Sequence, residues 1–206
     1  CAQLHIIYII NTKAVFIHTV CVITMKIKID ENIILDKIKE IDFDNLVKYL
    51  NNKEISDNTL VIPFPYSLED AKWWKNHLDE FETKNKTQKG WIIRHRNEGA
   101  IGCISLNNTH GLSSHKNEIG YWLAKPFWNN GIMSKVVTKF TDYCLNTLRF
   151  DRIEAPIFHW NISSEKVLEK SGFQLEGILK NYTKKGSQLI DVKMYSKLKK
   201  RHTTQG

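Results

Sequence analysis

The stretch EIGYWLAKPFWNNGIMSKVVTKF, Glu118 to Phe140, joins a predicted strand to a predicted helix through a glycine. The helical pattern runs from about Asn130 to Leu148, with apolar side chains at Val136, Val137, Phe140, Tyr143 and Cys144. A glycine at a helix start lets the backbone approach a ligand closely, and the first N–H groups of a helix have no intrahelical partners. Gly131 therefore predicts an anion-binding site, although this motif taken alone is more often an ordinary loop.

Patterns on both sides of this join predict a mixed α+β domain. Residues 25–39 alternate apolar and polar positions, as a half-buried strand or hairpin does, and a short helix capped by Asp42 follows. Two prolines, Pro63 and Pro65, predict an extended linker. The later elements are a helix with a capping box at Ser67 and Asp70, a hairpin of Trp91–Ile93 and Ala100–Leu106, the strand RIEAPIF, a helix capped by Ser163 or Ser164 and ended by Gly172, and two long strands around Lys185 and Gly186.

Composition predicts one folded domain, because the 206 residues are 42% apolar. We expect the domain at residues 25–200, a basic tail at 201–206, and at 1–24 an apolar extension that is untranslated or tag-like. Membrane association of that extension is the alternative, although its apolar runs are shorter than the roughly 18 to 20 residues of a spanning helix. The four cysteines form no CxxC pair, which indicates reduced thiols and a cytoplasmic protein.

The net charge of +8 favours anionic partners without choosing among them. Five positive charges fall near the C-terminus, where a solvated tail is the simpler interpretation: Lys193, Lys197, Lys199, Lys200 and Arg201. The histidines show no recurrent spacing, so we expect no metal site.

Three segments occur in one order at one spacing: NEIGYWLAKPFWNNGIM, RIEAPIFHWNISSEKVLEKSGFQLEGILKNY and DVKMYSKL. Together they resemble the GNAT superfamily of acetyl-CoA-dependent N-acetyltransferases, within it the branch typified by RimJ and RimL, which IPFPYSLEDAKWW also resembles. The resemblance covers residues 33–198. It implies a mixed, mostly antiparallel sheet of six to seven strands, splayed between the fourth and fifth strands and flanked by about four helices.

The resemblance also implies where acetyl-CoA binds. The family's pyrophosphate loop would lie at Gly131, whose frame departs from the usual form at Trp128 and Met133. The pantetheine arm would lie between the two splayed strands, and Pro156 fits such a strand because no neighbour there needs its N–H. The implied cofactor contacts are Tyr121, Trp122, Leu123, Asn129, Asn130, Gly131, Ile132, Met133, Ser134, Asn161 and Ser164.

Acetyl transfer needs a base to make the amine neutral and an acid to protonate the departing thiolate. The family suggests Glu118 as the base, and a carboxylate in solvent or in a salt bridge is the alternative. The family's frequent acid is a tyrosine, but Leu168 stands at that position, and Ser164 is the substitute that the branch suggests. Ser164 as a helix cap and Asn161 as a loop-forming residue are the competing interpretations.

We expect an N-acetyltransferase that acts by direct transfer in a ternary complex. The branch suggests a protein N-terminal α-amine as the acceptor, with Trp74, Tyr182 and Tyr195 as wall residues of its groove. The alternatives are a small-molecule amine such as a polyamine or antibiotic, and a catalytically inactive basic binding module. A homodimer is left open, and neither DNA nor a membrane is expected as a partner.

Overall fold

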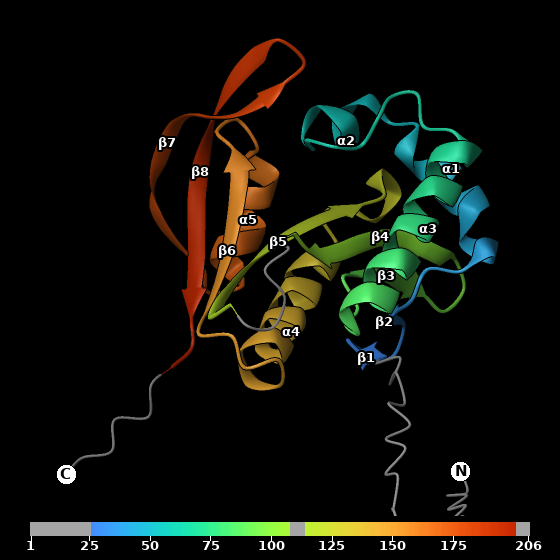
Figure 1. Cartoon of the computed structure of the whole chain (residues 1–206), viewed down its shortest axis with the longest axis horizontal. Coiled ribbons are helices and arrows are strands. Elements are labelled where there is room, and N and C mark those ends of the chain that lie inside the picture. The colour runs from blue at the N-terminus through green and yellow to red at the C-terminus, as the bar shows by residue number, and fades with distance from the viewer. Residues whose placement is uncertain (1–25, 108–113, 201–206) are drawn as a thin grey trace, which may run out of the picture.

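A computed structural model describes residues 26–107 and 114–200, and residues 1–25 and 201–206, including the predicted extension and tail, lie outside that part (Figure 1). Apart from α2, the strands and helices follow one another in the order that the sequence predicts. The elements are β1 Ile27–Lys28, β2 Ile33–Asp36, a 3-10 turn Glu40–Asp42, α1 Phe43–Leu50, α2 Lys53–Asp57, α3 Leu68–Asn85, β3 Gly90–His95, β4 Gly99–Leu106, β5 Lys116–Leu123, a 3-10 turn Lys125–Phe127, α4 Ile132–Asn146, β6 Arg152–Phe158, α5 Ile162–Lys170, β7 Gln174–Lys185 and β8 Gln188–Leu198.

The strands form one sheet in the order β1-β2-β3-β4-β5-β6-β8-β7. Every neighbouring pair is antiparallel except β5 and β6, which are parallel. The α+β class and the mostly antiparallel sheet are therefore confirmed. The sheet has eight strands instead of six to seven because the first alternating segment folds back as the hairpin β1–β2. The described helices are five instead of about four because α2 has no predicted counterpart.

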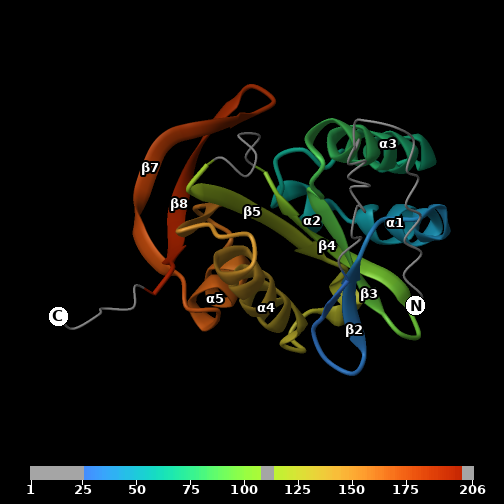
Figure 2. The same cartoon turned by 60° about the horizontal axis from the view of Figure 1, so that its bottom comes forward.

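Helices cover both faces of the sheet (Figure 2). Alternate side chains of β5 point to opposite faces: Ile119 and Leu123 pack in the cluster that includes α4 and α5, whereas Trp122 packs in the cluster that includes α1 and α3. The first cluster is centred on Phe140 of α4, which is fully buried and lies edge-on to Trp91, with ring centroids 4.8 Å apart. The two clusters thus pack against opposite faces of β5, while β4 pairs with one of its edges.

The predicted capping box of α3 is confirmed, the predicted cap of α1 is in position without a capping bond, and the predicted cap of α5 is wrong. The hydroxyl of Ser67 accepts from Asp70 N, and Asp70 Oδ2 accepts from Ser67 N. Asp42 occupies the N-cap position of α1 without making a capping bond. In α5 the cap is neither Ser163 nor Ser164 but Asn161, whose Oδ1 accepts from Ser164 N at 3.1 Å.

Two of the cations assigned to a solvated tail belong to the sheet instead. Lys193 and Lys197 lie in β8, where Lys193 Nζ pairs with Glu165 of α5 at 2.7 Å and Lys197 Nζ pairs with Asp142 of α4 at 3.4 Å. The β8 register places both side chains on the face that α4 and α5 cover, which the sequence pattern did not indicate.

The start of α1 is fixed to the sheet by Arg94 of β3. Its guanidinium donates to both carboxylate oxygens of Asp42, at 2.5 and 3.0 Å, and lies 3.7 Å from Asp36. Both carboxylates are at most 2% exposed. A buried carboxylate is costly without a partner, so Arg94 explains why Asp42 does not cap its helix.

Replacing Arg94 with methionine leaves buried Asp42 without its cation, while Asp36 keeps its ion pair with Lys39 at 2.7 Å. We expect the free energy of unfolding in urea to fall by about 3 to 5 kcal/mol. Arg96→Met is the matched control: its side chain is exposed, so its effect should stay within about 0.5 kcal/mol. A loss below about 1 kcal/mol for Arg94→Met would show that the cluster does not fix α1.

Candidate functional site

The two parallel strands part after three paired positions. Their ladder runs from Lys116–Arg152 to Glu118–Glu154, whereas β5 stays paired with β4 as far as Leu123. These are the fourth and fifth strands of the predicted count, so the splay lies where the sequence predicts it. From Ile119 onward the second edge of β5 has no ladder partner among the described strands. Such an edge presents backbone N–H and C=O groups that an extended ligand can pair with.

The helix α4 begins at the open end of this splay, after the 3-10 turn that follows β5. Gly131 is its N-cap, with φ of 70°, and has no side chain to bond to the first amides of the helix. A Cβ at Gly131 would have no atom within 4 Å, so a ligand has room to approach the first amides of α4, those of Ile132, Met133 and Ser134. A helix start of this kind attracts anions.

Both departures from the family's loop pattern point inward. Met133 is 7% exposed and packs in the α4–α5 cluster, and the indole Nε1 of half-buried Trp128 donates to Leu123 O at 2.7 Å. Trp128 therefore ties the loop to the end of β5. The helix mouth is left to backbone amides and to exposed Asn129 and Asn130.

The first residues of α5 face β5 on the side of the sheet that α4 and α5 cover. Tyr121 of β5 donates from its hydroxyl to Ser164 O at 3.3 Å, and burial raises the pKa of Tyr121 above its usual range. Asn161 and Ser164 are both half-buried. Leu168, which replaces the family's tyrosine, is fully buried in the core. The structure thus gathers Tyr121, Asn161 and Ser164 at one edge of the splay.

On the opposite face, Glu118 lies at the last paired position before the strands part. Burial raises the pKa of its carboxyl, with a further contribution from the negative charge of Glu154. Its Oε1 accepts a hydrogen bond from Asn107 Nδ2 at 3.3 Å. A partly buried carboxyl with a raised pKa is typical of a general base.

Glu154 differs from Glu118 because it forms ion pairs with both neighbouring cations, Lys116 and Arg152. Lys116 Nζ lies 3.1 Å from each of its oxygens, and Arg152 Nε donates to it at 2.8 Å. These hydrogen bonds outweigh the effect of burial and keep the pKa of Glu154 low. Arg152 also binds Glu176 of β7 and, together with Ser196, lowers the Glu176 pKa to about 2. Two of these three carboxylates, Glu154 and Glu176, thus share the two cations, and Glu118 has no ion-pair partner among the described residues.

The sequence analysis named Glu118 but missed the charges around it. The signal was present in the spacing, since Lys116 and Glu118 alternate along one strand as Arg152 and Glu154 do along the other. Joining the two pairs requires the parallel register of β5 and β6, which a single sequence does not give.

The predicted wall residues lie in different environments. Trp74 is half-buried on α3, and Tyr182 on β7 is 49% exposed. Tyr195 is 1% exposed beneath α5, where its hydroxyl donates to Glu165 Oε1 at 2.8 Å, which with burial raises the Tyr195 pKa. Tyr195 therefore lines no open surface.

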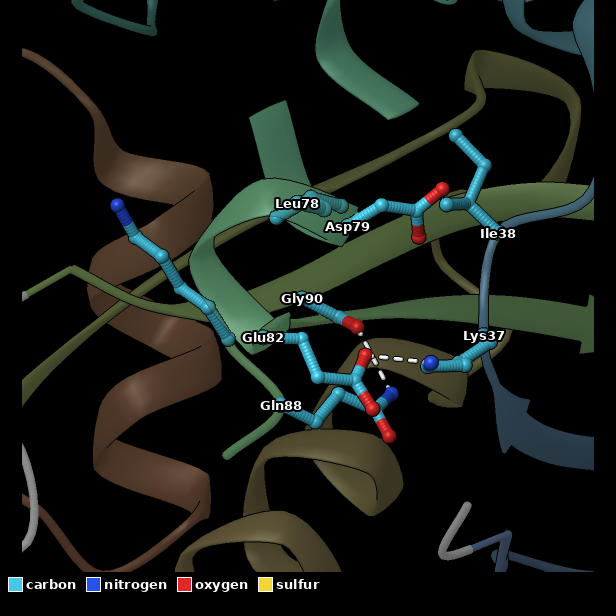
Figure 3. A pocket seen from close by; sticks show the side chains of 8 residues that line it. Lys37, Ile38, Leu78, Asp79, Glu82, Gln88 and Gly90 are labelled. Carbon is cyan, nitrogen blue, oxygen red and sulfur yellow. Dashed lines mark hydrogen bonds and ion pairs between the residues drawn. The ribbon is translucent and has the colours of Figure 1, made fainter. Parts of the chain in front are cut away.

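A small depression lies elsewhere, between α3 and the start of β3 (Figure 3). Its lining includes an ion pair of Lys37 with Glu82 at 2.5 Å and a hydrogen bond from Gln88 Nε2 to Gly90 O at 2.9 Å. It contains no residue of β5, β6 or α4, so it is separate from the splay. Within the described residues there is no cluster of metal-ligating side chains, and no helix there is long and apolar enough to span a membrane.

The site's residues fall within a recognised family pattern. The model of the acetyltransferase (GNAT) domain matches residues 32–174. An N-acetyltransferase of Bacillus licheniformis named p20 is 30% identical over 84% of this chain and 96% of its own length. Two Escherichia coli K12 proteins are also similar: the L-amino acid N-acetyltransferase AaaT is 24% identical over 77% of this chain and 93% of its own, and a ribosomal-protein-serine acetyltransferase is 25% identical over 64% and 79%.

Solved structures share the fold. The microcin C7 self-immunity acetyltransferase MccE, in complex with acetyl-CoA and AMP, superposes with a TM-score of 0.74 at 20% identity, covering 83% of this chain and 94% of its own. The ribosomal L7/L12 acetyltransferase RimL, in complex with coenzyme A, also gives 0.74 at 20% identity, covering 84% and 98%. The chain therefore belongs to the GNAT acetyltransferase family and is an acetyl-CoA-dependent N-acetyltransferase.

Proposed function

We propose that the chain acetylates an α-amine, most readily that of a protein N-terminus, by direct transfer in a ternary complex. The observation that carries this proposal is Glu118, a partly buried carboxyl with a raised pKa and no ion-pair partner in the described part of the chain, at the point where the splay opens. Two similar proteins support an α-amine, because one is named for L-amino acids and the other for a ribosomal protein. A free amino acid is thus the second candidate.

Acetyl-CoA supplies the acetyl thioester, and the residues at the splay fit it. We propose that the amides at the start of α4 bind its pyrophosphate, with Asn129 and Asn130 beside them. The open edge of β5, at Tyr121, Trp122 and Leu123, pairs with the pantetheine arm as an added strand. Asn161 and Ser164 contact the arm from the α5 side. The half-buried side chains of Asn161 and Ser164 and the open space around Gly131 support this placement.

Glu118 then acts as the base. An incoming amine is an ammonium at neutral pH, so Glu118 accepts its proton, directly or through water. The neutral nitrogen attacks the thioester carbon, the N–C bond forms and the C–S bond breaks. The departing thiolate takes a proton from Ser164, the proposed donor. The Ser164 hydroxyl regains a proton, through water, from the attacking nitrogen, which loses its second proton as the amide forms. Tyr182 and Trp74 are proposed to contact the acceptor.

The acceptor class is tested by supplying acetyl-CoA with a panel of peptides that have free N-termini, the same peptides with blocked N-termini, free L-amino acids and polyamines. Thiol release is followed for each. We expect the highest kcat/KM for free N-terminal peptides and none for blocked ones. Release with free amino acids alone would select the second candidate, and release with polyamines alone would contradict both.

Gly131→Glu places a carboxylate at the proposed pyrophosphate site. We expect its acetyl-CoA Kd to rise at least about tenfold, about 1.4 kcal/mol, through repulsion and lost space, as measured by isothermal titration. Gly186→Glu is the matched control, since Gly186 also has positive φ and open space but lies in the β7–β8 turn. Equal binding by the two variants would place the anion site elsewhere.

Glu118→Gln keeps the shape of the side chain and removes the base. We expect kcat to fall by about 10² to 10⁴-fold with little change in acetyl-CoA affinity. A loss below about threefold in the transfer assay would leave Glu118 as a structural carboxylate.

Glu154→Gln tests the charge arrangement around the base. It removes a negative charge beside Glu118 and frees Lys116 and Arg152 to pair with it, so the Glu118 pKa should fall. Because the base works when deprotonated, the acidic limb of the kcat/KM profile should move to lower pH. Asp191→Asn, which removes a carboxylate that pairs with Lys180, should leave the limb in place. If the acidic limb of the kcat/KM profile stays in place in Glu154→Gln, the charge of Glu154 does not affect the pKa of the base.

A further inference from the structure

The short helix α2 lies at the open end of the splay, where the β7–β8 turn reaches toward it (Figure 1). Asn52 caps this helix, with Oδ1 accepting from Glu54 N at 2.9 Å, and Ile55 anchors it in the cluster of α1 and α3. The helix thus belongs to the half of the molecule that carries β5.

One contact joins α2 to the end of β5. Lys125, two residues after the strand, pairs through Nζ with Glu54 Oε2 at 2.8 Å. Both side chains are at least half exposed, so this pair is weak and screened by salt.

A second contact joins α2 to the other side of the splay. Lys185, the last residue of β7, donates from Nζ to Thr59 O at 2.8 Å and also to Ser56 O. These carbonyls lie at the C-terminal end of α2, where a helix carries partial negative charge. The same Nζ lies 5.9 Å from the ring centroid of Phe158, the last residue of β6. The ammonium therefore bridges α2 and the ends of β6 and β7.

The face of the sheet beneath this bridge carries the small apolar cluster of Phe158, Ile190 and Val192. Helices α1 and α3 pack against β3, β4 and β5, through residues such as Ile92, Cys103 and Trp122. On β7, Leu179 pairs with Val192 and is 38% exposed. Glu118 lies on the same face as Phe158, because it pairs with Glu154 and side chains alternate along β6. An acceptor that enters from this end of the splay therefore passes beneath the bridge.

We propose that α2 is a crossbar that closes the open end of the splay, and that Lys185 is a specificity-determining residue which admits an amine on a narrow chain end and excludes bulky amines. The inference rests on the proposed function for its substrate class. The crossbar itself rests on the contacts of Lys185 and Lys125.

The test compares Lys185→Met, which keeps the aliphatic stem and removes the ammonium, with Lys184→Met at the exposed neighbouring position. In the full chain, we expect faster hydrogen exchange at the α2 amides in Lys185→Met alone, with unchanged acetyl-CoA affinity. The ratio of kcat/KM for an aminoglycoside to that for a peptide N-terminus should rise at least about tenfold in Lys185→Met and stay constant in Lys184→Met.

Equal hydrogen exchange at the α2 amides in the two variants would overturn the crossbar. Faster exchange at α2 in Lys185→Met, with an unchanged ratio of the two kcat/KM values, would overturn the specificity role. If the unaltered protein binds acetyl-CoA but acetylates neither acceptor, the proposed function fails and the specificity role fails with it. Hydrogen exchange at α2 still decides the crossbar in that case.

Discussion

The parallel pairing of β5 and β6 lasts for three positions, and the separation that follows creates the site. Backbone N–H and C=O groups on a strand edge need partners, either water or a ligand. Beside this edge, Tyr121 contacts Ser164 on one face, and β8 already pairs with the far side of β6. The same separation places the start of α4 beside the open edge, so the proposed anion site and the proposed strand-pairing site adjoin.

The charges at the last paired position follow from the same register. Parallel pairing sets Glu118 against Glu154 and Lys116 against Arg152 on one face. Because Glu154 forms ion pairs with both cations, burial and the negative charge of Glu154 outweigh the hydrogen bond from Asn107 and the charge of Lys116, and the pKa of Glu118 stays raised. An isolated strand could not produce this difference between two glutamates. It arises where two strands are still in contact and are about to part.

Local patterns predicted much of the fold. The capping box of Ser67, the hairpin of Trp91–Ile93 and Ala100–Leu106, and the glycine at the start of α4 each depend on a few nearby residues, and each is present. The helix α2 was not predicted because five residues are too few to show a helical period. At NISS, asparagine and serine are both good caps, and only the observed bond from Ser164 N selects Asn161.

Properties that depend on register were less accessible. Tyr195 was predicted on a groove wall, but pairing with Ala155 turns it to the face covered by α5. The cations around Glu118 and the contact of Lys185 with α2 join residues that are far apart in the chain, up to 129 positions. No periodicity or motif within one segment encodes such contacts.

The most direct measurement of the central claim is hydrogen exchange of the full chain with and without coenzyme A, resolved to short peptides. If the open edge of β5 and the start of α4 form the binding site, protection should concentrate in residues 119–123 and 131–135. Protection confined to other segments, with coenzyme A bound, would contradict the account of the splay as the cofactor site.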